Sequence, residues 1–92
     1  MIQDIKVIHK NLGKKRLWGQ AIFETNTIEI DIRAKGKKFL EILMHELNHL
    51  CFPYLTEEEI TKKSIQATNV LWEQGIRPTD NSNNINLQDG TL

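Results

Sequence analysis

The sequence predicts an α+β fold in which a short antiparallel sheet precedes two packed helices. Residues 27–33 alternate isoleucines with charged residues, which is typical of a strand with one buried face. Residues 38–52 and 56–74 carry apolar side chains at helical spacing. The chain has 92 residues, a length that suits one domain, which we place at residues 1–77.

Two further segments have strand character. In residues 4–9 apolar side chains alternate with polar ones, and the polar, basic residues 10–17 predict a loop after them. Residues 18–24 and 27–33 predict a hairpin with a two-residue turn at Thr25-Asn26. This register brings the apolar residues of both strands onto one face, with Phe23 opposite Ile28, Ala21 opposite Ile30 and Gly19 opposite Ile32.

The first predicted helix, residues 38–52, ends before Pro53. It is apolar on almost every side, except where ionisable residues interrupt it. A helix of this kind is buried on two sides, so we expect it to lie between the sheet and the second helix. The single cysteine, Cys51, falls on its apolar face and is expected in the core.

The second predicted helix begins at Thr56, which forms a capping box with Glu59. Gly75 is well placed to end the helix. Residues 78–92 are rich in Asn, Asp and Ser and predict a disordered tail. The main apolar stripe of the helix consists of Ile60, Ala67, Val70 and Leu71.

The charges of the chain balance overall but not locally. Twelve Lys/Arg and twelve Asp/Glu leave no net field that favours DNA or an acidic membrane. Residues 1–38 nevertheless carry nine of the basic and only four of the acidic residues. The loops of this half predict a basic rim, formed by Lys14, Lys15, Arg16, Lys35, Lys37 and Lys38. Because these lysines lack interleaved aromatic residues, they give little support for nucleic acid as a partner.

Membrane and secretory classes are not expected. No apolar run approaches the length of a bilayer span, and the first residues lack the apolar core and cleavage site of a secretory signal. One cysteine excludes an internal disulfide and fits a reducing compartment. We therefore expect a cytoplasmic protein.

The strongest chemical signal is His45-Glu46-Leu47-Asn48-His49, an HExxH sequence within the first helix. Histidines four residues apart lie about one helical turn apart on the same face, so both imidazoles can bind one tetrahedral Zn²⁺. Glu46 is rotated by about 100° from His45 and stands beside the metal. Its carboxylate can there accept a proton from a water that the zinc activates. The alternative is a pair of core histidines that bond to their neighbours.

A catalytic zinc usually has three protein ligands. No His or Cys follows Cys51, so a ligand from downstream must be a carboxylate. Glu57 falls near the middle of the apolar arc of the second helix, Glu58 near its edge, and Glu59 points away. A carboxylate on a buried face needs a partner, and a metal is a suitable one. We expect Glu57 as the third ligand and Glu58 as the alternative; all three could instead simply favour the helix dipole.

Other polar residues have smaller predicted roles. Glu41, one turn before His45, could orient that histidine through a hydrogen bond or be a plain helix carboxylate. Weaker candidates for the same supporting role are Asn48, Glu29 and Asp31. Tyr54 could offer its phenol to an oxyanion, but a turn residue that packs on the helices is the stronger expectation. His9 is expected as a surface residue of a strand, and Trp18 and Trp72 as packing residues.

Five segments between residues 17 and 78 form a recognisable set: Leu17-Trp18-Gly19, the strand TIEIDI, the helix FLEILMHELNHL, the acidic PYLTEEEI and finally LWEQGIRP. Together they resemble the small phage-type zincin-like metallopeptidases. The resemblance implies a minimal zincin-like fold with zinc held by His45, His49 and Glu57 or Glu58, and with Glu46 as the general base. For a phage-encoded protein, the compartment would be the host cytoplasm.

These observations predict a zinc-dependent metallohydrolase and, within that class, a metallopeptidase that cleaves a protein or peptide. The alternative is a non-catalytic binding module whose zinc stabilises a small core, with nucleic acid as one partner to be tested. The sequence leaves the oligomeric state open.

Overall fold

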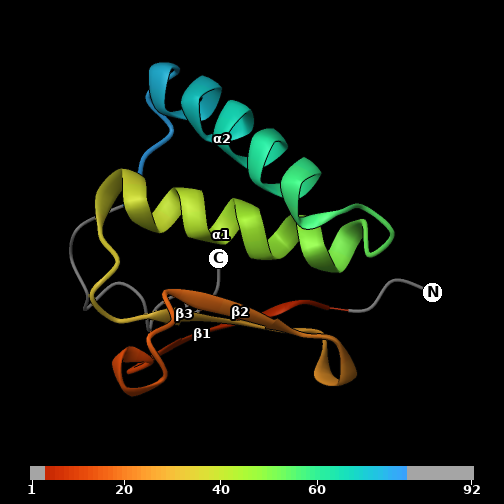
Figure 1. Cartoon of the computed structure of the whole chain (residues 1–92). Coiled ribbons are helices and arrows are strands. Elements are labelled where there is room, and N and C mark those ends of the chain that lie inside the picture. Colours follow the sequence, from red (N-terminus) through yellow and green to blue (C-terminus); the bar gives the residue numbers. More distant parts are fainter. Residues whose placement is uncertain (1–3, 79–92) are drawn as a thin grey trace.

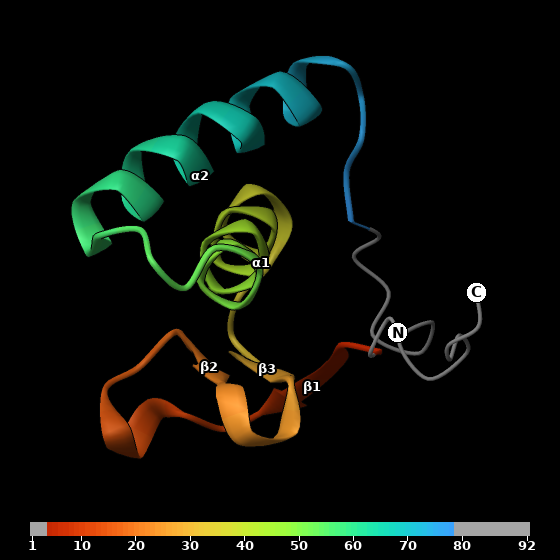
Figure 2. The ribbon, with the colours of Figure 1, turned by 90° about the vertical axis from the view of Figure 1, so that its right-hand side faces the viewer.

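Three layers make up the structure: a three-stranded sheet, the helix α1 on one face of it, and the helix α2 over α1 (Figure 1). A view along α1 has this helix between the sheet and α2 (Figure 2). The computed structural model describes residues 4–78. The predicted α+β class is confirmed. In chain order the described elements are β1 (Lys6–Lys10), the 3₁₀ turn η1 (Gly13–Lys15), β2 (Gly19–Ile22), the 3₁₀ turn η2 (Phe23–Thr25), β3 (Thr27–Asp31), α1 (Gly36–Cys51) and α2 (Glu57–Glu73).

The sheet is mixed, so the prediction of an antiparallel sheet is wrong for one of its strands. Its order is β1-β3-β2, with β3 in the centre. β2 runs antiparallel to β3, as predicted, but β1 runs parallel to it. Residues 11–18 carry the chain from one edge of the sheet to the other, and the buried Leu12 anchors this crossing. Alternation of side chains reports that a segment is a strand but not its direction, which explains the error.

The hairpin of β2 and β3 differs from its predicted register by two residues. Gly19 pairs with Ile30 rather than with Ile32. The connection is longer than the predicted turn, because η2 occupies Phe23–Thr25 and Asn26 has a left-handed backbone with φ of 54°. Asparagine tolerates that conformation better than most residues. Since the shift is an even number, the predicted face of each side chain is retained.

The central strand β3 is buried on both faces, whereas its alternation predicts one solvated face. Ile28 and Ile30 are completely buried and pack with Ile42 of α1. Glu29 and Asp31 alternate with them and are buried as well, with 6% and 0% of their surface exposed. A central strand has neighbours on both sides, and here these neighbours also supply polar partners for the carboxylates.

α1 is buried on two sides, as predicted, and begins at Gly36, two residues earlier than expected. Toward the sheet, Ile42 joins a core that Phe39, Leu43, Leu47 and Leu50 extend. Toward α2, the side-chain amide of Asn48 donates a hydrogen bond to Ser64 Oγ at 3.0 Å. Cys51, however, is exposed and not in the core, because α1 ends at this residue and the turn that follows leaves it uncovered.

α2 begins as predicted but packs through different residues. The capping box is confirmed: Thr56 Oγ1 accepts a hydrogen bond from the Glu59 N–H, and the Glu59 carboxylate accepts one from the Thr56 N–H. Gly75, with φ of 83°, follows the end of the helix. The predicted apolar stripe is wrong in part, since Val70 is 59% exposed. The buried residues of α2 are instead Ile60, Ser64 and Thr68, which are spaced four residues apart. Two of them have short polar side chains.

The predicted domain, residues 1–77, contains all the described elements. The segment 78–92, for which composition predicts a disordered tail, lies outside the described residues except for Pro78. Neither helix found within residues 4–78 is long and apolar enough to cross a membrane.

Candidate metal centre

His45 and His49 lie one turn apart on the side of α1 that faces α2. Their ring centroids are 4.9 Å apart. The apolar residues of α1 occupy the side toward the sheet, which leaves the histidines at the boundary between the two helices. Their side chains are 23% and 25% exposed, so most of each ring is shielded while one edge stays accessible.

Glu57, the first residue of α2, bridges the two histidines. Its Oε2 lies 2.9 Å from His45 Nε2, and its Oε1 lies 2.9 Å from His49 Nε2. The capping box holds the first turn of α2 and therefore the backbone that carries this carboxylate. Of the two glutamates expected as a third ligand, Glu57 is the one brought to the histidines, and Glu58 is exposed outside the cluster. We call His45, His49 and Glu57 the α1–α2 cluster.

The donors of the α1–α2 cluster fit a metal ion. One nitrogen of each histidine and one carboxylate oxygen all lie within 4.8 Å of one another. Two ligand atoms of a tetrahedral zinc ion are about 3.3 Å apart at bond lengths of about 2.0–2.1 Å, so small adjustments bring all three to one ion. An exposed ion pair alone is worth only about 0–1 kcal/mol, and the Glu57 side chain is 69% exposed. Folding stability by itself gives little reason for this arrangement.

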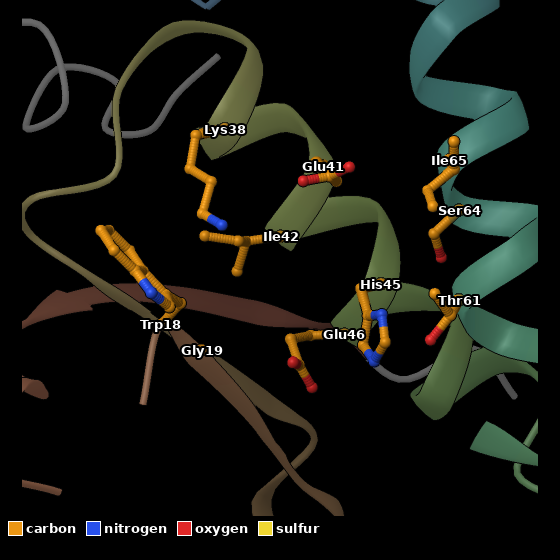
Figure 3. Close-up of a pocket in the computed structure, with 10 residues that line it drawn as sticks. All are labelled: Trp18, Gly19, Lys38, Glu41, Ile42, His45, Glu46, Thr61, Ser64 and Ile65. Atoms are coloured by element: carbon orange, nitrogen blue, oxygen red, sulfur yellow. The ribbon is translucent and has the colours of Figure 1, made fainter. Parts of the chain in front are cut away.

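Glu46 follows His45 but lies outside the α1–α2 cluster, along the cleft in Figure 3. Its partial burial raises the pKa of its carboxyl group; the nearby His45 and His49 lower this pKa, and Glu57 raises it. The carboxylate therefore stands beside the cluster without being one of its donors. From such a position a carboxylate can exchange protons with a water at the cluster.

A cleft with a volume of about 300 Å³ lies along the cluster, between α1, α2 and the start of β2 (Figure 3). Trp18 and Gly19 line it from the sheet, and Thr61 and Ser64 line it from α2. The lining residues of α1 include Lys38, Glu41, His45 and Glu46. One candidate ligand, His45, and the candidate base, Glu46, thus line the same cleft.

Gly19 lets α1 lie close to β2 at this cleft. A Cβ at this position would be 2.5 Å from Ile42 Cγ2 and 3.4 Å from Glu46 Cγ. Packed interiors do not accommodate the first of these distances unless the Ile42 side chain, the helix or the strand shifts. The missing side chain therefore keeps the edge strand next to Glu46.

Asp31, a weaker candidate for a supporting role, is satisfied within the sheet. It accepts hydrogen bonds from the N–H of Leu12 at 2.8 Å, the N–H of Arg33 at 2.8 Å and Arg33 Nε at 2.7 Å. The Arg33 side chain is the main reason that the pKa of Asp31 falls to about 2. Its partners belong to the end of the sheet and not to the α1–α2 cluster.

Glu29 is held in a similar way on the same strand. It accepts hydrogen bonds from Gln20 Nε2 at 2.6 Å and from Lys10 Nζ at 3.2 Å. The bond from Gln20 is the largest cause of its lowered pKa. We call Glu29 and Asp31 the β3 carboxylates. Both join neighbouring segments to the central strand.

The remaining candidates are distributed around the fold. Glu41 lines the cleft, and Asn48 joins α1 to α2 through the hydrogen bond described above. Tyr54 is 77% exposed, so its predicted packing on the helices is wrong. His9 is partly buried and not a plain surface residue, because it stacks on Phe39 with a centroid distance of 5.4 Å. Burial and then the charge of Lys35 lower the pKa of His9.

The sequence interpretation misses the position of Trp18, for which it predicts a packing role. Trp18 is 41% exposed at one end of the cleft. The Arg33 guanidinium lies 4.4 Å and the Lys38 ammonium 4.8 Å from its ring centroid. Three residues from three segments meet here, and no local spacing in the sequence signals this contact.

Comparisons with family models, with curated proteins and with solved structures find no match for this chain. The assignment of function therefore rests on the HExxH motif and on the geometry of His45, His49, Glu46 and Glu57.

Proposed function

We propose that the protein is a zinc-dependent metallohydrolase, a metallopeptidase of minimal zincin-like fold that cleaves a protein or peptide substrate. The observation that carries this proposal is the convergence of His45 Nε2 and His49 Nε2 on the carboxylate of Glu57, each at 2.9 Å, with Glu46 alongside. Two imidazoles, one carboxylate and a separate carboxylate base are the donor set of a hydrolytic zinc site.

Each residue of the site has a distinct task in this proposal. His45, His49 and Glu57 hold the ion between α1 and α2. Zinc, when bound, supplies Lewis-acid chemistry by acidifying water and polarising a carbonyl group. The carboxylate of Glu46 takes a proton from the attacking water and delivers it to the leaving amine. Partial burial raises the pKa of Glu46, which favours its holding of this proton between the two transfers.

An extended peptide suits the cleft because β2 is an edge strand. β2 pairs only with β3 within the described sheet, so its other edge has main-chain groups available beside the cleft. A peptide can add to such an edge through main-chain hydrogen bonds. The close approach of β2 and α1 at Gly19 would then bring a peptide carbonyl near Glu46.

A second function, a zinc-stabilised binding module without turnover, is favoured by one observation. The α1–α2 cluster joins two helices of a small domain, and a metal that binds only the folded state stabilises it. A bridging ion would therefore contribute to the fold whether or not the protein is an enzyme. For either function we propose the cytoplasm as the compartment, in keeping with a free, exposed Cys51.

The proposal is tested with Glu46→Gln on purified full-length protein. Wild type should bind about one zinc ion per chain and cleave a fluorescently labelled, unfolded protein such as casein. Glu46→Gln should keep its zinc and lose about 10²–10⁴-fold in cleavage rate, the usual contribution of a general base. Metal content is measured by elemental analysis.

Two variants control this experiment. His45→Ala should lose zinc, and Glu58→Gln, outside the cluster, should keep both zinc and activity. A wild type that binds no zinc would refute the metal site. A wild type that binds zinc but cleaves neither the unfolded protein nor a peptide library would favour the binding module.

A further inference from the structure

One end of the molecule collects exposed cations from two loops. β1 and β3 are parallel and end at the same side of the sheet, and the antiparallel β2 starts there. The loop after β1 and the loop from β3 into α1 therefore meet at this end, as Figure 1 shows. We call the exposed cations of these loops and of the first turn of α1 the basic end: Lys14, Lys15, Arg16, Lys35, Lys37 and Lys38.

The carboxylates near this end are already occupied. Asp31 is engaged by Arg33 and by the Leu12 N–H, and Glu29 is engaged by Lys10 and Gln20. Within the described residues, none of the six cations of the basic end forms an ion pair. The charge of Lys15 still acts on Glu29 and helps to lower its pKa. The basic end therefore presents six exposed cations without a direct ion-pair partner in the described part of the chain, although the whole chain has a net charge of zero.

The basic end is continuous with the cleft. Lys38 lines the cleft and also belongs to the basic end, and its ammonium group lies 4.8 Å from the centroid of the Trp18 ring (Figure 3). Trp18 is partly exposed at the same place. Glu41 is the acidic residue of this part of the cleft; Figure 3 has it on the side of α1 toward Ile65, while Lys38 extends toward Trp18. A chain that leaves the cleft past Trp18 thus meets lysines.

We propose that the substrate carries acidic residues on the side of the cleaved bond that leaves the cleft past Trp18. Lys38 binds the nearest Asp or Glu, and the other cations of the basic end attract those that follow. This inference rests on the proposed peptidase function and deepens it, because it names the substrate class as peptides with an acidic flank.

An acidic peptide fits these observations better than a nucleic acid. Lys38 of the basic end lines a cleft that the start of the edge strand β2 also lines, which suits an extended peptide. Single-stranded nucleic acid binds through exposed aromatic faces, but Arg33 and Lys38 already lie over the ring of Trp18.

Cleavage-site profiling tests the inference. Zinc-loaded wild type is incubated with a peptide library made from a digested proteome, and the new termini are identified by mass spectrometry. Asp and Glu should be enriched about threefold to tenfold on one side of the cleaved bond, the range expected from one or two exposed ion pairs. The enrichment should shrink in 1 M NaCl, because salt screens exposed charges.

Charge reversal assigns the effect to the basic end. Lys38→Glu should remove the acidic enrichment or replace it by a basic one. Lys6→Glu changes the net charge equally but lies at the other end of β1, so it should leave the profile unchanged.

A binding readout separates recognition from turnover, because the variant used should keep its zinc but lacks the general base. Fluorescence anisotropy compares zinc-loaded Glu46→Gln with two synthetic peptides, one built around a cleaved sequence with an acidic flank and one with Asn and Gln in that flank. The acidic peptide should bind about threefold to tenfold more tightly, and Lys38→Glu should abolish the difference.

The outcomes separate the two proposals. Cleavage without acidic enrichment, or an enrichment that Lys38→Glu leaves intact, would overturn this inference and leave the peptidase function standing. Absence of any cleavage would overturn the peptidase function and this inference with it. Binding of oligo(dT) at low salt in preference to the acidic peptide would assign the basic end to nucleic acid instead.

Discussion

The β3 carboxylates and the α1–α2 cluster both pair carboxylates with nitrogen groups, yet their surroundings are opposite. Asp31 is completely buried and accepts three hydrogen bonds from backbone and side-chain donors of its own chain. Glu57 is 69% exposed and meets two imidazole nitrogens at an accessible boundary between helices. The β3 carboxylates are thus engaged inside the fold, whereas the α1–α2 cluster has donors that can turn to an ion.

The difference indicates how structural and functional polar groups can be told apart in a small domain. A buried carboxylate with several donors stabilises the fold, because removal of any partner leaves an unsatisfied group. An exposed carboxylate held between two histidines contributes little to folding. We propose a metal ion as the reason for its arrangement, and substitutions at the two sites should therefore affect different properties.

The largest effect on stability is expected from Asp31→Ala. The buried Leu12 N–H loses its acceptor, which costs about 1–3 kcal/mol, and Arg33 loses its partner as well. Urea unfolding of the zinc-free protein measures the loss. Glu58→Gln, at an exposed position, serves as the control and should unfold like wild type. An unchanged unfolding midpoint for Asp31→Ala would contradict the structural role.

A smaller effect should appear in acid. The pKa of Asp31 in the folded protein is about 2, below its ordinary value of 3.8, so its stabilising contribution is complete above that value and is lost as the pH falls toward 2. Glu29 has a lowered pKa and acts in the same direction. Thermal midpoints between pH 5 and pH 2 should therefore fall less steeply for Asp31→Asn than for wild type. Parallel curves would exclude Asp31 as a cause.

The smallest effect on folding is expected from Glu57→Gln. In the zinc-free protein this exposed side chain should change the free energy of unfolding by less than about 1 kcal/mol. Its zinc affinity should nevertheless fall roughly 100-fold or more, since even residues behind the ligands of a metal contribute about 10–100-fold. Competition with a zinc-binding dye measures this affinity. An equal loss for Glu58→Gln would shift the third ligand to that residue.

Much of the layered arrangement could be predicted from local patterns. The near-continuous apolar surface of α1 requires two packing partners, and the capping box marks the start of α2 within one residue. The alternation of side chains along a strand predicts which residues of the hairpin share a face. This prediction is unaffected by the two-residue error in register. These properties depend on residues close in sequence, which is why they are accessible from it.

Other features depend on contacts between distant segments. The direction of β1 has no local signature in the sequence. The same is true of the hydrogen bond from the Leu12 N–H to Asp31 and of the contacts of Arg33 and Lys38 with the Trp18 ring. The packing face of α2 is missed for another reason: Ser64 and Thr68 are polar, and a search for apolar periodicity passes over them. Glu57 could be singled out because it lies one turn before the buried Ile60, but the expected burial of its carboxylate is wrong, since the first turn of α2 leaves its side chain 69% exposed.

Gly19 has a consequence for how far this chain can diverge. Any larger residue there would collide with Ile42, so the Ile42 side chain, the helix or the strand would have to shift. A shift of the helix would widen the spacing between the edge strand and Glu46, even in a variant that keeps every other side chain of the site. A substitution at Gly19, which has no functional group, can therefore change the surroundings of Glu46.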